Sequence, residues 1–228
     1  MGQTIPQETH EQLFTSGEYV RLFQPEVDAN PFAATYAAKR DAVLALVEGQ
    51  DRRVLDVGGG PGRMALPLAQ RHDVTMCDIS GQMLDQVRPH APTRLTLKVA
   101  DARALPFPGE SFDYALLIDV LPHLPELDTA LAEARRVLVK GGRLIIDSTN
   151  HNPLWMLAYP RYAGRKPGRW LSTALGGGVP PEWQSRVWHR GRGEFLDAVS
   201  RHGFRVLSVR GFGPRLCPKW HLAVAEAT

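Results

Sequence analysis

The sequence has few cysteines and no long hydrophobic run. Two of its 228 residues are cysteines, Cys77 and Cys217, far apart in the chain. This number excludes a disulfide-rich scaffold, and the spacing matches no metal-binding motif. No stretch approaches the ~18 consecutive apolar residues of a membrane span, so we expect no stable membrane insertion. The first residues contain no apolar segment typical of a secretory signal peptide, so we expect a protein of the reducing cytoplasm.

The sequence also has little net charge. It contains 27 Lys and Arg against 24 Asp and Glu, which gives a formal net charge of +3 at pH 7. Proteins that bind nucleic acids concentrate basic residues on one face. The segment 53–149 is close to neutral and gives no such face. We therefore expect a small-molecule partner rather than a nucleic acid, while the sequence leaves the oligomeric state open.

Short apolar segments alternate with helical segments in the first two thirds of the chain. Strands are predicted at 53–57, 74–77, 95–99, 112–118 and 143–147, and helices at 64–70, 82–87 and 127–138. This alternation indicates βαβ units and a parallel sheet. A helix at 194–201 and strands at 204–209 and 221–225 continue the same core.

We interpret residues 1–228 as a single domain with two additions. Residues 1–50 form an N-terminal helical cap, in which Pro31 begins a helix that Gly49 ends. Residues 152–187 form an insertion, because the periodic pattern stops there and resumes afterwards.

The insertion combines cations with large aromatic residues and has no acid between residues 152 and 181. Such a segment fits a solvated loop, and it fits equally a substrate lid with an apolar floor and a cationic rim. A lid of this kind suits an anionic or aromatic substrate and leaves peripheral docking to an anionic membrane surface open. The expected lid residues are Trp155, Tyr159, Arg161, Tyr162, Arg165 and Trp170.

A glycine-rich loop follows the first predicted strand, in the segment VLDVGGGPG at residues 54–62. Glycine tolerates positive φ and has no Cβ, so a ligand can lie against bare backbone there. The spacing is G-x-G-x-G. The dinucleotide-binding pattern G-x-G-x-x-G fails because Arg63 stands at the third glycine, which disfavours an NAD-dependent reductase.

Three acids lie near the ends of the first three predicted strands. Asp56 lies two residues before the glycines, Asp78 directly follows the second strand, and Asp101 lies just after the third. Open α/β sheets bind ligands at the carboxyl edge of their strands. A carboxylate at position 78 can accept hydrogen bonds from both hydroxyls of a ribose. Each acid taken singly could instead be a helix or turn cap.

Taken together, these segments resemble class I S-adenosylmethionine (SAM)-dependent methyltransferases. VLDVGGGPG is similar to their first motif. The later motifs match Asp78-Ile79-Ser80 with Met83-Leu84, Asp101-Ala102 with Leu105-Pro106-Phe107, Phe112-Asp113 with residues 119–124, and Arg136-Val137-Leu138 before Gly141-Gly142. The resemblance runs from about residue 53 to 149 and is nearest to the subgroup that contains ubiquinone and menaquinone biosynthesis methyltransferases.

The resemblance implies an α/β, Rossmann-like fold: a seven-stranded, mostly parallel sheet with its last strand antiparallel and helices on both faces. It implies SAM as cofactor and S-adenosylhomocysteine as product. It places Asp56, Gly58 and Gly60 around the methionine part of SAM, Asp78 on the ribose, Ile79 on the adenine, Asp101 and Ala102 at the adenine amino group, and Ile118 and Asp119 near the sulfonium. Met83 would contact the nucleoside or belong to the core.

A catalytic residue is harder to identify, because the sulfonium of SAM is already a strong electrophile. The protein must mainly align the acceptor, and a base helps only where the acceptor loses a proton. His123 is the candidate base, although it could equally bond to nearby backbone. The chain lacks the Asn/Asp-Pro-Pro-aromatic tetrad of relatives that methylate planar amines.

We therefore expect methylation at oxygen or carbon of a quinol-like, phenolic or other small metabolite. The alternatives are an N-methyltransferase of a small amine and a SAM-binding protein without transferase activity.

Overall fold

A computed structural model describes residues 33–124, 126–149, 190–213, 215 and 218–228 of the chain. These residues form a seven-stranded sheet with the order β3-β2-β1-β4-β5-β7-β6. Strands β1 to β5 pair in parallel, whereas β7 runs antiparallel to β5 and β6. The strands are β1 Arg53–Val57, β2 Asp73–Asp78, β3 Leu95–Val99, β4 Phe112–Leu117, β5 Leu138–Thr149, β6 Phe204–Phe212 and β7 Trp220–Ala227.

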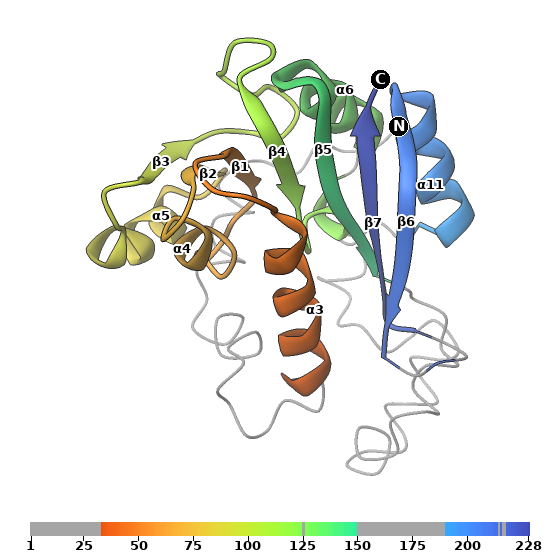
Figure 1. Ribbon diagram of the computed structural model, residues 1–228, viewed down its shortest axis with the longest axis horizontal. Coiled ribbons are helices and arrows are strands. Elements are labelled where there is room, and N and C mark those ends of the chain that lie inside the picture. Colours follow the sequence, from red (N-terminus) through yellow and green to blue (C-terminus); the bar gives the residue numbers. More distant parts are fainter. Residues whose placement is uncertain (1–32, 125, 150–189, 214, 216–217) are drawn as a thin grey trace, which may run out of the picture.

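Helices cover both faces of this sheet (Figure 1). On one face lie α3, α4 and α5, and on the other lie α6 and α11. Two short 3-10 helices, η1 and η2, follow α5 and β4. The bounds are α3 Ala33–Leu46, α4 Ala65–Leu68, α5 Gly81–Val87, η1 Arg88–His90, η2 Leu121–His123, α6 Leu127–Val137 and α11 Arg192–Arg201.

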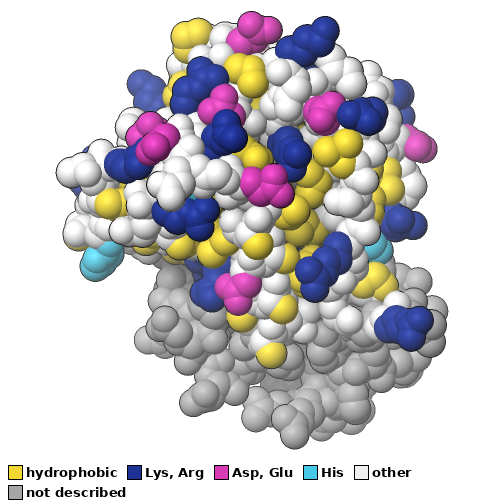
Figure 2. Space-filling view, in the orientation of Figure 1, with side chains coloured by type: hydrophobic (Ala, Val, Ile, Leu, Met, Phe, Trp, Pro, Cys, Tyr) yellow, Lys and Arg dark blue, Asp and Glu magenta, His cyan; other side chains and the backbone are white. Residues whose placement is uncertain are grey.

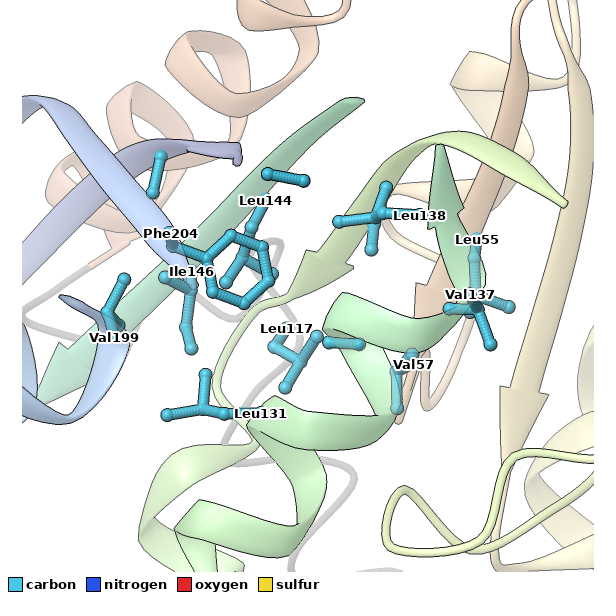
Figure 3. Close-up of a cluster of buried hydrophobic side chains, with 14 of the residues drawn as sticks. Leu55, Val57, Leu117, Leu131, Val137, Leu138, Leu144, Ile146, Val199 and Phe204 are labelled. Carbon is cyan, nitrogen blue, oxygen red and sulfur yellow. The ribbon is translucent and has the colours of Figure 1, made fainter. Parts of the chain in front are cut away.

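Two hydrophobic cores lie on the two faces of the sheet because successive strand residues point to opposite sides. In β1, Leu55 and Val57 pack toward α6 and α11, whereas Val54 packs toward α3, α4 and α5. Figure 3 shows the first of these cores, where Leu131 of α6 and Val199 of α11 lie beside strand residues. Burial on both faces makes the sheet a rigid support for the loops at its edge.

The strand order reverses between β1 and its neighbours β2 and β4. The chain leaves β1 toward β2 and β3 and then crosses back to β4. In open α/β sheets the loops diverge at such a reversal, at the carboxyl ends of the strands, and ligands bind there. The glycine-rich loop follows β1 at this point.

The predicted fold class is confirmed, with differences in element length. The helix predicted at 64–70 is only Ala65–Leu68, so it adds little helix dipole to the glycine loop. The strand predicted at 143–147 is longer, because β5 begins at Leu138 and includes Gly141 and Gly142. They form an irregularity, because the pairing with β4 jumps from Leu138 to Arg143.

Charges of both signs are mixed on the described surface that faces the viewer in Figure 2. No basic face is visible among these described side chains from this side. None of the described helices has the length and apolar character that crossing a membrane requires. Of the predicted N-terminal cap at 1–50, the described part is residues 33–50, and the insertion at 152–187 lies outside the described residues.

Candidate functional site

The glycine-rich loop after β1 is tied to the end of β2. The backbone N–H groups of Gly58 and Gly59 both donate to the carbonyl oxygen of Cys77, at 2.7 and 3.2 Å. Gly58 has φ +67°, and a Cβ there would stand 2.6 Å from Val120 Cγ2. Both the backbone conformation and the close approach therefore require glycine at position 58.

Gly60 occupies a different environment in the same loop. Its φ is +52°, and no described heavy atom lies within 4 Å of the place where a Cβ would stand. A side chain at position 60 would thus meet backbone strain but no neighbour. This bare backbone beside open space, at the reversal of the strand order, is what a closely bound ligand needs.

Asp56 is a buried carboxyl group directly before the glycines. Its side chain accepts a hydrogen bond from the backbone of Ala65, while its Oδ2 atom has no hydrogen-bond partner among the described residues. Burial, together with the nearby charge of Asp78, raises the pKa of Asp56 to about 7. A buried carboxylate oxygen without a partner suits a ligand that brings a positive charge or a donor.

Asp78 ends β2 and joins two loops. Its Oδ2 accepts the backbone N–H of Gly60 and its Oδ1 accepts that of Ser80, both at 2.9 Å. Burial raises the pKa of this carboxyl group despite those hydrogen bonds. Each carboxylate oxygen can accept more than one hydrogen bond, so Asp78 keeps the capacity to accept ribose hydroxyls.

Asp101 lies two residues beyond β3 and is held by a close cation. Its carboxylate accepts the backbone N–H of Arg103 at 2.8 Å and pairs with the Arg103 guanidinium at 2.6 Å. This is the geometry of a turn cap, the alternative that the sequence left open. Ala102 beside it is partly buried against the core.

Beyond β4 the chain takes an unusual turn at Asp119. Ile118 is buried, and Asp119 has a left-handed backbone conformation with φ +61°. The backbone N–H of Asp119 donates to Asp147 Oδ1 at 2.7 Å. The carboxyl ends of β4 and β5 are thereby joined through a side chain.

A buried lysine on α3 completes this arrangement. Lys39 is 0% exposed, and its Nζ atom lies 2.6 Å from Asp119 Oδ1 and 2.6 Å from Asp147 Oδ2. The two carboxylates raise the pKa of Lys39 although burial alone would lower it. Burial raises the pKa of Asp147 to about 6, while the pKa of Asp119 falls below its ordinary value because Lys39 outweighs burial.

Two aromatic rings enclose the Lys39 ammonium group. Its Nζ atom lies 4.9 Å from the ring centres of both Tyr36 and Trp220, and the rings meet edge to face. Arg63 lies over the Tyr36 ring at 5.1 Å and Lys219 over the Trp220 ring at 4.8 Å. Burial lowers the pKa of Lys219 to about 8. Cations and aromatic faces attract each other, so these contacts stabilise the cluster.

The remaining candidates that the structure describes lie around this edge. His123 lies in η2, where its backbone N–H donates to the carbonyl oxygen of Val120 at 2.9 Å, and its side chain is half-buried. Ile79 is partly buried next to Asp78. Met83 is buried in α5 but belongs to none of the hydrophobic clusters of the described residues.

Sequence reasoning missed Lys39 and Asp147, although both left a signal. Lys39 lies three residues after Tyr36 and four before Val43, which puts it on the apolar stripe of its helix. Asp147 directly follows the apolar run 144–146, just as Asp56 directly follows the apolar residues Val54 and Leu55. The lid candidates Trp155, Tyr159, Arg161, Tyr162, Arg165 and Trp170 lie outside the described residues.

The described residues therefore form one edge with three features that suit a nucleoside cofactor: an open glycine backbone, an acid at the end of β2 and a buried carboxylate oxygen without a partner. Across the described part of the chain, no group of three or more His, Cys, Asp or Glu is arranged to hold a metal ion.

Comparison with known proteins also points to a protein that binds a nucleoside cofactor. The family model of a methyltransferase domain matches residues 55–146. The chain is 33% identical over 196 residues to a ubiquinone/menaquinone biosynthesis C-methyltransferase of Allorhizobium ampelinum, a match that covers 79% of this chain and 76% of that protein. It is 38% identical over 130 residues to the protein of the same name from Paracoccus denitrificans, covering 53% of this chain and 51% of that one.

The match to the first curated relatives spans only about half of their length, at 51%, 46% and 49%. Among solved structures, the magnesium protoporphyrin IX methyltransferase of Synechocystis, with bound S-adenosylhomocysteine, is similar in fold. It has a TM-score of 0.72 at 18% identity and covers 98% of this chain and 100% of its own.

Proposed function

Because the chain belongs to the class I SAM-dependent methyltransferases, we propose that it transfers the methyl group of SAM to a carbon or oxygen atom of a small organic acceptor. The observation that carries this proposal is the joining of the glycine loop to Asp78. The Gly60 N–H donates to Asp78 Oδ2 at 2.9 Å, directly beside open space at the strand reversal. A carboxylate fixed at that place suits a ribose, which has two neighbouring hydroxyls to donate to it.

In this proposal each residue at the edge binds a different part of the cofactor. Asp56, Gly58 and Gly60 surround the methionine part, and the Asp56 oxygen without a partner is the acceptor for its ammonium group. Asp78 holds the ribose, Ile79 and Met83 pack on the adenine ring, and the loop at Asp101 and Ala102 closes over the adenine amino group. Ile118 and Asp119 line the sulfonium end of the pocket.

The cofactor, when bound, supplies a methyl group on a sulfonium, which is a strong electrophile. The chain then has to align an acceptor with that methyl group and keep water away. The buried rings of Tyr36 and Trp220 meet edge to face near the end of β5, where Trp220 pairs with Thr149, and provide a dry wall on that side. His123 in η2 is our candidate for taking a proton from an acceptor hydroxyl on its imidazole nitrogen.

Two independent features support the proposed acceptor class. The curated relatives are named for C-methylation in ubiquinone and menaquinone biosynthesis, which favours a quinone-type acceptor. The insertion at 152–187 carries Arg161, Arg165, Lys166 and Arg169 among aromatic residues, which favours an apolar ring with acidic character. We propose that this segment acts as the substrate lid.

Binding and turnover test the two levels of the proposal separately. Calorimetry should detect SAM and S-adenosylhomocysteine, and no binding of NAD. Selective NAD binding would overturn the assignment of the cofactor. A screen of quinols, phenols, hydroxy acids and amines, read by release of S-adenosylhomocysteine, should identify the acceptor. Turnover of amines alone would refute methylation at carbon or oxygen and leave the cofactor assignment intact.

The lid is tested with the acceptor that the screen identifies. Replacing Arg161, Arg165, Lys166 and Arg169 together by Gln should raise the KM of an anionic acceptor and leave the Kd of SAM unchanged. The increase should shrink as ionic strength rises, because salt screens attraction by surface cations. An unchanged KM at low salt would show that these cations do not contribute to acceptor capture.

A further inference from the structure

The most unusual feature beside the proposed cofactor pocket is a closed ring of three charged residues. The Lys39 ammonium contacts Asp119 Oδ1 and Asp147 Oδ2, each at 2.6 Å. The backbone N–H of Asp119 donates to Asp147 Oδ1 at 2.7 Å, which closes the ring. The three residues come from α3, the turn after β4, and β5. Both Lys39 and Asp147 are almost completely buried.

This ring holds Asp119 in a conformation that it would otherwise avoid. A left-handed φ such as its +61° is uncommon for residues other than glycine, although Asp tolerates it better than most. Two contacts offset that cost: the N–H of Asp119 is bound by Asp147, and its carboxylate is bound by Lys39. Asp119 Oδ2 is left without a hydrogen-bond partner among the described residues.

The ring also sets the charge of Asp119. Two buried carboxylates that share one cation compete for it, and the one with less stabilisation takes up a proton first. Here Asp147 is that residue, because 1% of its side chain is exposed to water against 28% for Asp119. Burial accordingly raises the pKa of Asp147, whereas Lys39 keeps the pKa of Asp119 low. Tyr36, Arg63 and Lys219 also face this group, but Lys39 is the cation with direct contact to both carboxylates.

We propose that Lys39 is a positioning residue for Asp119: it keeps the Asp119 carboxylate ionised and fixed at the end of β4, where it attracts the sulfonium of the cofactor. This inference rests on the proposed function. A lysine that only anchored α3 to the sheet would stabilise the protein without any effect on how the pocket distinguishes a positively charged ligand from a neutral one.

SAM and S-adenosylhomocysteine provide that comparison, because only SAM carries the sulfonium charge. The ratio of their Kd values also cancels the contribution of Asp56, whose proposed partner, the ammonium group, is present in both ligands. In the wild-type protein this ratio should change little between about pH 6.5 and about pH 7.5, because Asp119 stays ionised there and the window lies above the pKa of Asp147 and below that of Lys219.

Lys39→Met should make the ratio depend on pH. Without the lysine, Asp119 and Asp147 share a proton as the pH falls, and the preference for SAM should drop about tenfold, the change that corresponds to about 1.4 kcal/mol. Lys39→Arg keeps the charge and should restore a constant ratio. Lys140→Met removes an exposed lysine near the other end of β5 and serves as the matched control.

The outcomes are separable. If the wild-type protein binds neither ligand, the proposed function fails. If it binds both and Lys39→Met weakens them equally at every pH, Lys39 is only an anchor and the inference is wrong. Should Lys39→Met not fold, Lys39→Met/Asp147→Asn removes the uncompensated second carboxylate. Asp119 still lacks its cation there, so the preference for SAM should still fall, at lower pH.

Discussion

The backbone N–H of Gly60 donates to Asp78 Oδ2 over 2.9 Å, and the two residues are eighteen positions apart in the chain. This contact links the loop after β1 to the last residue of β2. It places the carboxylate next to Gly60. Among the glycines of this loop, Gly60 is the one whose Cβ position has no described heavy atom within 4 Å. A change at either residue should therefore affect ligand binding more than it affects folding.

Asp78→Ala should weaken SAM binding by about 1.5–3 kcal/mol, the range for hydrogen bonds to a charged group. Isothermal titration calorimetry measures this directly. Asp73→Ala is the matched control, because Asp73 begins the same strand at the opposite edge and its exposed side chain pairs with Arg94. Equal affinities for the two variants would show that Asp78 serves only as a cap.

Gly60→Ala should lower SAM affinity, and Gly141→Ala should not. Both glycines have positive φ, at +52° and +76°, and neither has a described heavy atom within 4 Å of a Cβ position. Each alanine should therefore cost a similar free energy of unfolding, about 1–2 kcal/mol, for the left-handed backbone. Because Gly141 lies at the opposite edge of the sheet, a parallel loss of SAM affinity in both variants would point to general destabilisation.

The free energy of unfolding of the ligand-free protein should fall as the pH rises from about 4 to about 7. Burial and Asp78 raise the pKa of Asp56 to about 7, whereas in the unfolded chain it returns to about 3.9. Between these values the folded protein keeps a proton that the unfolded chain has released.

Asp56→Asn should make this decline shallower, because the amide does not titrate. Urea unfolding between about pH 5 and about pH 8 measures the slope in each variant. Asp73→Asn, which changes an exposed carboxylate, should keep the wild-type slope. A slope in Asp56→Asn identical to that of the wild type would show that Asp56 is already ionised in the folded protein.

Lys39→Met should reduce the free energy of unfolding near neutral pH by about 3–5 kcal/mol, the usual cost of leaving a buried charge unpaired. Adding Asp147→Asn should recover part of that loss, because one of the two unpaired carboxylates is then gone. Chemical denaturation of the two variants gives the comparison. If the double variant is no more stable than Lys39→Met, packing around the lysine, not its charge, dominates the effect.

The cofactor side of the site could be predicted from sequence because its signals are local. The glycine spacing, the acids at strand ends and the alternation of strands and helices are all readable within short windows, and the described sheet matches them. Asp78 was identified correctly as a strand-end acid because β2 ends at that residue. Its bonds to Gly60 and Ser80 follow from the position of that strand end.

The charged ring could not be predicted because its members meet only in three dimensions. Lys39 lies 80 residues from Asp119 and 108 from Asp147, so no short window of the sequence contains the lysine together with a carboxylate that binds it. The lysine on the apolar stripe of α3 was the detectable anomaly, since a buried lysine implies a buried partner. Which carboxylates supply that partner depends on the crossover that brings β4 and β5 beneath the helix.

The position of β7 has a consequence for how the protein is made. This strand lies between β5 and β6, although it follows both in sequence, so β5 and β6 cannot be joined until Trp220–Ala227 have left the ribosome. Trp220 at its start also forms one wall around Lys39. A nascent chain should therefore hold an incomplete pocket and an exposed strand edge until that point.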